Sequence, residues 1–245
     1  MTGADAAGWA LVTGASGDIG SVVAERLADD GYDLVLHTFR RQQAADGLAQ
    51  RVRQRGRRAL VIRANFAAAG ATGRFADQVA EATGGVTAMV AAAASGVMRP
   101  AAELTEHHLD WTFAVNTRAL SLLATRLRPR STVALTSPGA ASVVPGYAGI
   151  GPSKAALESL VRYLAVELAP ACRVNALSAG LVGTRAARLL PGWEELAVSM
   201  PARTPLARLV TADDIASAAA WLISGQAAMV TGTTLILDGG RHLLL

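Results

Sequence analysis

The run Thr13-Gly14-Ala15-Ser16-Gly17-Asp18-Ile19-Gly20 decides the fold, because it joins a strand pattern to a helical one. Residues Trp9–Thr13 before it are apolar, and Ile19–Asp30 after it has the spacing of an amphipathic helix. Glycines at such a turn let backbone N–H groups approach a pyrophosphate at the helix N-terminus. The loop therefore predicts a dinucleotide site. Its expected cofactor contacts are Gly14, Ser16, Asp18 and Ile19.

Strand patterns and helical patterns alternate along the rest of the chain. Strands that are apolar on both faces and separated by helices require a parallel sheet covered on each side. Right-handed crossovers then give a doubly wound α/β sheet in a single domain, residues 1–245, with ligands at the carboxyl ends of the strands. The further expected strands are Asp33–Thr38, Ala59–Arg63, Val86–Ala91, Ser131–Thr136, Arg173–Leu177 and Thr233–Leu237. The further expected helices are Gln42–Arg55, Thr72–Thr83, Ala102–Arg128, Lys154–Leu168 and Thr211–Ser224.

One connection is unusually long. Residues 181–211 contain three prolines, Pro191, Pro201 and Pro205. A connection of about thirty residues in a compact domain is commonly a lid or a functional insertion. A lid-like insertion is expected here, and its Trp193 and Met200 could cover a flat apolar substrate.

Composition excludes several classes of protein. The chain has 245 residues, 51% of them hydrophobic, which is enough for a full core. A single cysteine, Cys172, excludes a disulfide framework, and four scattered histidines predict no metal site. No signal peptide or membrane span is expected, so we predict a cytoplasmic protein. The arginines between Arg51 and Arg58 predict a solvated helix face rather than a nucleic-acid site, because aromatic residues make up only 4% of the chain.

Lysine is nearly absent from the sequence. Of the 23 basic residues, Lys154 is the single lysine and the others are arginines. A lone lysine in such a background suggests a site that needs a compact ammonium rather than a planar guanidinium, although chance is the alternative.

The residues after the second strand indicate which dinucleotide binds. The stretch His37-Thr38-Phe39-Arg40-Arg41 has two arginines and no acidic residue that could accept hydrogen bonds from the ribose hydroxyls of NAD. A guanidinium can hold a 2′-phosphate through paired, charge-assisted bonds. We therefore predict NADPH, bound by Arg40 and Arg41; alternatively, these arginines only begin the next helix.

Taken together, these residues resemble the short-chain dehydrogenase/reductase family over essentially the whole chain, which implies a Rossmann fold and oxidoreductase activity. The Thr13–Gly20 loop is similar to the TGxxxGxG motif of that family, with Asp18 in place of the middle glycine. The stretch Asn175–Gly180 resembles the one that precedes the nicotinamide contacts. The resemblance implies an adenine contact at Asn65, catalytic roles for Asn116, Ser137 and Lys154, and nicotinamide contacts at Val182 and Thr184.

The catalytic pattern departs from the family at its acid. The usual tyrosine four residues before the lysine is replaced by Ile150, which has no proton to give. Tyr147 lies seven residues before Lys154, which on a helix returns to nearly the same face. This Tyr-x6-Lys spacing resembles bacterial enoyl-acyl-carrier-protein reductases, as does Ser153–Glu158. It suits an enoyl thioester, whose carbonyl oxygen lies two bonds further from the hydride-accepting carbon than in a ketone.

Other departures point toward ketones. Ser137 keeps the hydroxyl that steadies a developing alkoxide, and Val143 stands where similar enoyl reductases carry another tyrosine. Ala91 and Ala92 replace an asparagine pair. The composition is also similar to that of actinomycete proteins.

We therefore expect an NADPH-dependent ketoreductase of an aromatic, angucyclinone-type polyketide in antibiotic biosynthesis. The alternatives are an enoyl-acyl-carrier-protein reductase acting on a carrier-bound substrate, and a cofactor-binding regulator without turnover. Lys154 would hold the nicotinamide ribose and feed a proton chain through Asn116, with Tyr147, water or a substrate phenol as the final donor. The long helices and the Leu243–Leu245 tail suggest a homo-oligomer, a dimer or tetramer.

Overall fold

A parallel sheet of seven strands forms the centre of the protein, in the order β3-β2-β1-β4-β5-β6-β7. The computed structural model describes residues 8–190 and 192–244. The strands are β1 (Trp9–Thr13), β2 (Asp33–Thr38), β3 (Ala59–Arg63), β4 (Ala88–Ala91), β5 (Ser131–Thr136), β6 (Arg173–Ala179) and β7 (Thr234–Leu237). Strand order reverses between β1 and β4, which opens a crevice at their carboxyl ends. The predicted doubly wound α/β fold is confirmed.

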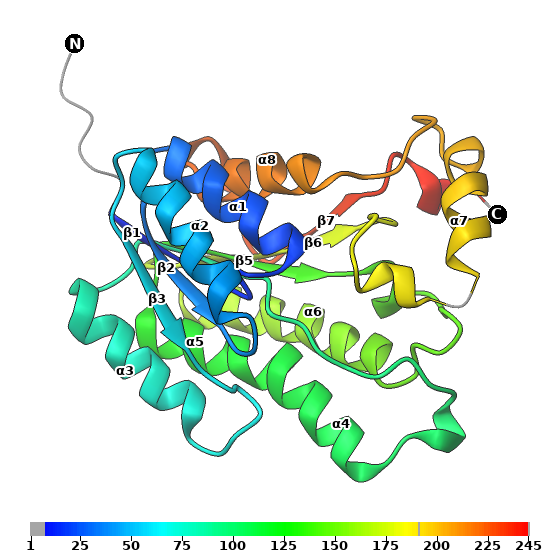
Figure 1. Ribbon diagram of the computed structural model, residues 1–245, viewed down its shortest axis with the longest axis horizontal. Coiled ribbons are helices and arrows are strands. Elements are labelled where there is room, and N and C mark those ends of the chain that lie inside the picture. Colours follow the sequence, from blue (N-terminus) through cyan, green and yellow to red (C-terminus); the bar gives the residue numbers. More distant parts are fainter. Residues whose placement is uncertain (1–7, 191, 245) are drawn as a thin grey trace.

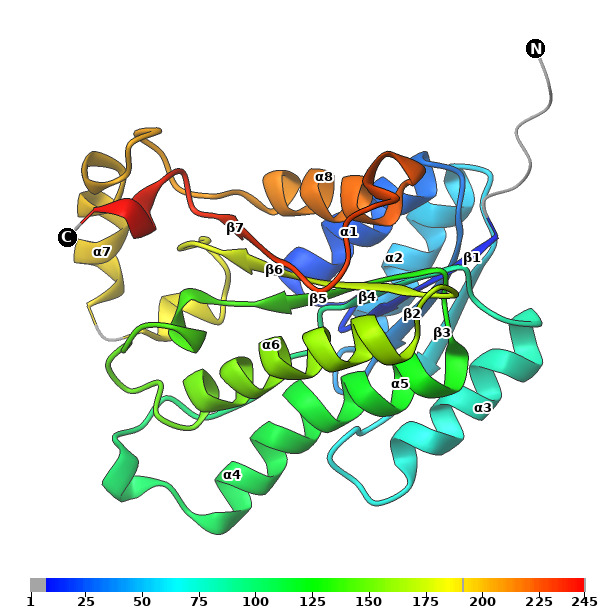
Figure 2. The ribbon, with the colours of Figure 1, turned by 180° about the vertical axis from the view of Figure 1, so that it is seen from behind.

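Helices cover both faces of this sheet (Figure 1 and Figure 2). One face carries α1 (Asp18–Asp29), α2 (Gln42–Gln54) and α8 (Ala212–Ile223); the other carries α3 (Ala71–Thr83), α5 (Ala119–Leu127) and α6 (Ile150–Glu167). Neighbouring residues of β1 belong to two hydrophobic cores, one on each face of the sheet. Val12 packs in the core under α1 and α8, and Leu11 packs in the core under α3 and α6. That double burial explains why the strands read as unbroken apolar runs. In the described part of the chain, no helix is long and apolar enough to cross a bilayer.

The expected single helix over Ala102–Arg128 is present from Glu106 to Leu127, but it is not α-helical throughout. The segment contains α4 (Glu106–Phe113), a π-helical turn (Ala114–Arg118) and α5. Thr105 fixes the start of α4 through a capping box, in which its hydroxyl accepts a hydrogen bond from the His108 N–H at 3.3 Å. Sequence periodicity continues across all three pieces, so it could not show the π-helical turn.

The 181–211 insertion is more ordered than its prolines suggested. It includes α7 (Trp193–Ser199), which the sequence analysis did not predict, and short 3₁₀ turns at Ala187–Leu189 and Pro201–Arg203. It stands beside the C-terminal segment at one end of the sheet (Figure 1). The Leu206 N–H donates to the Gly239 carbonyl at 3.2 Å, which ties the two segments together. Pro191 lies outside the described residues.

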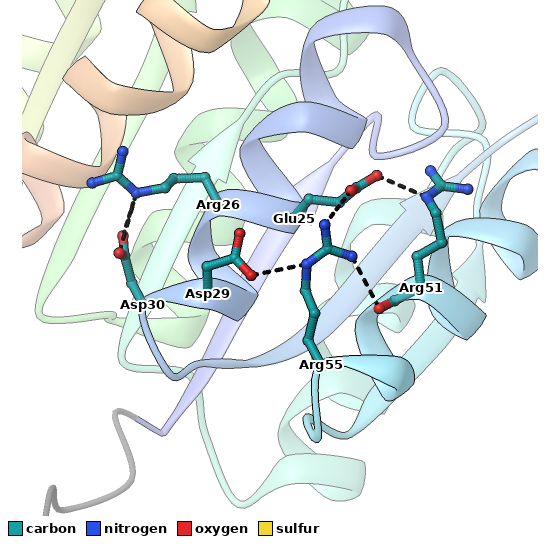
Figure 3. A network of polar contacts seen from close by, with 6 residues as sticks. All are labelled: Glu25, Arg26, Asp29, Asp30, Arg51 and Arg55. Atoms are coloured by element: carbon teal, nitrogen blue, oxygen red, sulfur yellow. Dashed lines mark hydrogen bonds and ion pairs between the residues drawn. The ribbon is translucent and has the colours of Figure 1, made fainter.

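Two arginines of the Arg51–Arg58 cluster form ion pairs with the neighbouring helix α1. Glu25 of α1 pairs with Arg51 at 2.8 Å and with Arg55 at 2.7 Å, and Asp29 pairs with Arg55 at 2.9 Å (Figure 3). These contacts lie on the surface between α1 and α2, where each pair stabilises only weakly. The charges of Arg51 and Arg55 are therefore paired with a neighbouring helix, which agrees with a helix-face interpretation of the cluster.

A buried histidine that the sequence analysis missed fastens the glycine-rich loop. His37 of β2 accepts a hydrogen bond from the Gly14 N–H at 3.0 Å through Nδ1, so its proton lies on Nε2, which donates to the Ala64 carbonyl at 3.1 Å. Its ring stacks on Phe66 with centroids 4.0 Å apart. Burial lowers the pKa of His37 to about 4. A neutral imidazole therefore holds the loop over the physiological pH range.

This histidine makes a pH-dependent contribution to stability. The unfolded chain binds a proton at His37 near pH 6.5, whereas the folded protein does so only near pH 4. Unfolded protein thus holds more protons between these values, so stability is lost as the pH falls. We expect the wild type to lose about 3 kcal/mol more than His37→Gln between pH 7 and pH 4 in urea unfolding experiments. Equal losses in the two proteins would contradict this role.

Replacing either of two helical glycines by alanine should change the free energy of unfolding, but in opposite directions. A Cβ at Gly20 in α1 would lie 2.4 Å from the Gly14 carbonyl oxygen, whereas a Cβ at Gly47 in α2 meets only the Arg51 guanidinium at 3.9 Å. Gly20→Ala should destabilise by about 1–3 kcal/mol through overpacking. Gly47→Ala should stabilise by about 0.5–1 kcal/mol through helix propensity. Urea unfolding of both variants checks the pair, and a stable Gly20→Ala protein would disprove the close approach.

Candidate active site

A cleft of about 1210 Å³ lies at the carboxyl ends of the strands. It is larger than a typical site for one small ligand, so it can hold a dinucleotide together with a substrate. All but one of the site residues predicted from the sequence line it, Asn116 being the exception. Those that line it are Gly14, Ser16, Asp18, Ile19, Arg40, Arg41, Asn65, Ser137, Tyr147, Lys154, Val182 and Thr184.

The glycine-rich loop forms the floor of one end of the cleft. Gly14 adopts a left-handed conformation with φ of +66°, and a Cβ there would lie 2.8 Å from the Ala93 backbone after β4. The Ser16 and Thr38 hydroxyls are 2.8 Å apart, which joins the loop to the end of β2. Only residues without bulky side chains allow this approach of three backbone segments. The resulting cradle fits a dinucleotide whose phosphates lie at the start of α1.

An ion pair crosses the cleft from this loop to the insertion. Asp18, the first residue of α1, accepts a hydrogen bond from the Arg185 N–H at 2.7 Å and pairs with the Arg185 guanidinium. Burial raises the pKa of Asp18, but the bonds from Arg185 outweigh this and hold the pKa below its ordinary value. Arg185 therefore neutralises a carboxylate that stands where the family motif has glycine. The sequence analysis missed this arginine.

The two arginines after β2 differ in what they can still bind. Arg41 donates to the Ser16 carbonyl. The exposed Arg40 guanidinium lies over the rings of Phe39 and Trp111, at 5.2 and 5.6 Å from their centroids, and hydrogen-bonds no described residue. Stacking orients the guanidinium while its N–H groups remain available to an anion. Asn65 also lines this end of the cleft.

The lysine predicted to be catalytic lies at the other end. Lys154 of α6 is 5% exposed, and its Nζ donates to the Leu135 carbonyl of β5 at 2.7 Å. Burial lowers the pKa of Lys154 to about 8, and the negative charge of Glu158 opposes that effect. Most Lys154 side chains therefore carry the charged ammonium at neutral pH. In the described part of the chain, this ammonium makes a single hydrogen bond to the protein.

Ser137 and Tyr147 lie together, and both line the cleft that Lys154 also lines. A Cβ at Gly139 would lie 2.7 Å from Tyr147 Cδ1 and 3.4 Å from Ser137 Oγ, so that glycine makes room for the ring. Burial raises the pKa of Tyr147, and the Ser137 hydroxyl lowers it in part. Ser137 Oγ is buried and lies near the Tyr147 side chain, but it makes no well-formed hydrogen bond to a described residue. Buried hydroxyls are normally satisfied, so this atom is suited to a ligand.

The expected helical relation between Tyr147 and Lys154 is wrong. Helix α6 begins at Ile150, and Tyr147 lies in the preceding turn, where its carbonyl accepts a hydrogen bond from the Gly151 N–H at 2.7 Å. Ile150 is 7% exposed and does not line the cleft. A Cβ at Gly96 would lie 2.3 Å from Ile150 Cγ1, so this side chain packs against the loop after β4.

Asn116 acts as a brace between two parts of the chain. Its Oδ1 accepts a hydrogen bond from the Ser95 N–H at 2.8 Å, and its Nδ2 donates to the Ser95 carbonyl and to Ser153 Oγ, both at 2.9 Å. These bonds join the π-helical turn to the loop after β4 and to α6. The amide is fully engaged, and the proton chain through Asn116 stays a prediction.

The insertion gives the catalytic end an apolar wall. Leu190, Leu196 and Met200 line the cleft, whereas Trp193 does not. The insertion is anchored at its start, because Val182 forms a β-bridge with Val210. Thr184 lines the cleft close to that bridge, and its hydroxyl accepts a hydrogen bond from the Ala187 N–H at 3.1 Å. A largely apolar substrate is therefore suited to this end.

Comparison with known proteins places this geometry in a family. Residues 14–242 match the family model described as Enoyl-(Acyl carrier protein) reductase. The chain is 32% identical to 1-cyclohexenylcarbonyl-CoA reductase from Streptomyces collinus, with 96% of this chain and 86% of the relative covered.

Two solved structures share the fold closely. A short chain dehydrogenase from Burkholderia cenocepacia in complex with NADP is 29% identical, with a TM-score of 0.86 over 96% of this chain and 98% of that one. LugOII, a promiscuous reductase that catalyses keto-reduction at C1 during lugdunomycin biosynthesis, is 27% identical, with a TM-score of 0.85 over 96% and 97%. The chain therefore belongs to the short-chain dehydrogenase/reductase family of oxidoreductases.

Proposed function

We propose that this protein is an NADPH-dependent reductase of α,β-unsaturated thioesters, carried by CoA or by a carrier protein. The observation that supports it best is the position of Tyr147, which lines the cleft beside Ser137 while Ile150 packs away from it. The matching family description and the name of the Streptomyces relative agree with this substrate class. This ranks the thioester above the ketone, which the sequence alone had favoured.

NADP(H) is the proposed cofactor, and when bound it supplies the hydride. The cradle around Gly14 suits its phosphates, and Arg40 offers unengaged N–H groups to a 2′-phosphate. The relative from Burkholderia cenocepacia, which was solved with NADP, supports this choice. Lys154 would hold the nicotinamide ribose through its remaining N–H groups.

The side chains at the catalytic end suit the charge that thioester reduction creates. Reduction of the conjugated double bond builds negative charge on the thioester oxygen, which needs a hydrogen-bond donor. Tyr147 would donate to this oxygen, and the nearby ammonium of Lys154 would favour the phenolate left behind. Ser137, whose hydroxyl makes no well-formed hydrogen bond to a described residue, would orient either the phenol or the oxygen. The apolar insertion would cover the acyl group.

Reduction of an aromatic polyketide ketone, of the angucyclinone type made in antibiotic biosynthesis, is the second candidate. Ser137 favours it, because a hydroxyl without a well-formed hydrogen bond to a described residue could hold a ketone oxygen directly. Similarity to LugOII also supports it. In this case a substrate phenol or water would supply the proton.

We further propose a homo-oligomer. Strand β7 is an edge of the sheet, and Ile236 on it is 45% exposed. Trp221 of α8 and Met229 after it are also exposed apolar side chains. Unpaired apolar edges favour association with a second copy. Leu243 and Leu244 of the tail are exposed, whereas Leu245 lies outside the described residues. A cytoplasmic location stays a prediction.

The two candidate reactions should respond differently to removal of single hydroxyls. For thioester reduction, Tyr147→Phe should lower kcat for crotonyl-CoA with NADPH by about 100-fold or more, because the oxygen loses its acid. Ser137→Ala should lower kcat by a smaller factor, because the phenol or the substrate oxygen would lose only its orientation. For ketone reduction the order should reverse. Steady-state rates on crotonyl-CoA and on a tetracyclic aromatic ketone measure both.

The matched control is Ile150→Val, a conservative change at a residue outside the cleft, which should leave both rates within about twofold. A Tyr147→Phe enzyme with undiminished thioester turnover would reject the proposed acid. Tight NADPH binding by the wild type with no turnover of either substrate would favour a regulator.

Cofactor preference should depend on Arg40. We expect Arg40→Ala to raise KM for NADPH by about 10- to 100-fold while KM for NADH changes little, because only NADPH carries the 2′-phosphate. Arg74→Ala, at an exposed arginine of α3 that does not line the cleft, is the control and should change neither value. Equal effects of Arg40→Ala on the two cofactors would show that this arginine does not read the phosphate.

A further inference from the structure

The Lys154 ammonium is buried without an ion pair. It is 5% exposed, and no carboxylate lies within 4.0 Å of it in the described part of the chain. Its hydrogen bond goes to the uncharged Leu135 carbonyl. A buried charge is costly unless a counter-charge stands near it. None of the other predicted catalytic residues, Asn116, Ser137 and Tyr147, carries a negative charge at neutral pH.

Glu158 stands one helical turn further along α6. Residues four apart share one face of a helix. Its Oε1 accepts a hydrogen bond from the Thr136 hydroxyl at 2.8 Å, while Lys154 bonds the carbonyl of the preceding residue, Leu135, at 2.7 Å. Both side chains therefore reach from α6 to consecutive residues at the end of β5, which sets carboxylate and ammonium side by side without direct contact.

We propose that Glu158 is a positioning residue that keeps Lys154 protonated in the cleft, with Thr136 holding the carboxylate out of direct ion-pair contact. A direct pair would occupy ammonium N–H groups that the cofactor ribose needs. A carboxylate held one step away supplies the charge and leaves those groups free. This inference rests on the proposed function only in that Lys154 serves a bound cofactor.

Among the described residues, Glu158 is the acidic group whose charge acts on Lys154. From the loop before α6, Tyr147 is neutral near pH 7, because the ordinary pKa of tyrosine is about 10 and burial raises it further. The β5 groups are an uncharged carbonyl and hydroxyls. Arg162, the next charge along α6, donates to the Glu158 backbone carbonyl rather than to its carboxylate. Burial lowers the pKa of Lys154 to about 8 even with Glu158 present.

The sole lysine makes a direct test possible. Protein labelled with lysine carrying ¹³C at Cε gives one resonance, whose shift during a pH titration reports the protonation of Lys154. Glu158→Gln keeps an acceptor for Thr136 but removes the charge, and should lower the midpoint by about 1–2 pH units. Glu158→Asp keeps the charge and should restore part of the difference. Glu167→Gln, which removes an exposed acid at the end of α6, is the matched control and should not shift it.

Cofactor affinity gives a second readout. The ammonium is lost as the pH rises through its pKa, so Kd for NADPH should rise on the basic side, and in Glu158→Gln this rise should begin about 1–2 pH units lower. Fluorescence titration with NADPH between pH 6 and pH 9.5 measures it. Coincident lysine midpoints in the wild type and Glu158→Gln, or an equal shift in Glu167→Gln, would overturn the assignment.

Failure of the proposed function would look different. A lowered lysine midpoint in Glu158→Gln, combined with no turnover of thioester or ketone by the wild type, would refute the reductase proposal and leave the role of Glu158 intact.

Discussion

A buried ammonium at the carboxyl end of β5 is the constraint on which the candidate site depends. Lys154 reaches the Leu135 carbonyl from α6, so the helix must approach the sheet closely at that level. Gly151 permits this approach, because a Cβ there would lie 2.7 Å from the Gly139 carbonyl oxygen. The same approach brings the turn that carries Tyr147 against Ser137. The position of the Lys154 ammonium, the close approach of α6 and the meeting of the Ser137 and Tyr147 side chains therefore depend on one another.

The two ends of the cleft are built by different means. At the dinucleotide end, backbone groups form most of the cradle. The neutral His37 accepts a hydrogen bond from the Gly14 N–H without adding charge. At the catalytic end, side chains from a turn and from one helix face meet. The Asp18–Arg185 pair joins the first end to the insertion that covers the second. The start of α1 and the insertion are thus in direct contact across the cleft.

The sequence predicted those parts of the fold that depend on local pattern. Short runs of uncharged, mostly apolar or β-branched residues, such as Trp9–Thr13 and Ser131–Thr136, predicted strands with the observed bounds, because both sheet faces are buried. The start of α6 was misplaced, since Gly149 gives it no side-chain cap to recognise. His37 and Arg185 were missed because their partners, Gly14 and Asp18, lie 23 and 167 residues away in the chain.

The replacement of tyrosine by Ile150 changes more than one functional group. At the first position of α6, isoleucine packs into the space that Gly96 leaves open, so the position becomes part of the interior. In the proposed thioester reduction the acid would come from the turn before the helix, where Tyr147 is held by its backbone bond to Gly151 and by a β-bridge with Arg99. A hydroxyl on a turn reaches an oxygen at a different distance from one on the helix. The reaction that this cleft favours therefore depends on the conformation of a glycine-rich turn as much as on the identity of the acid.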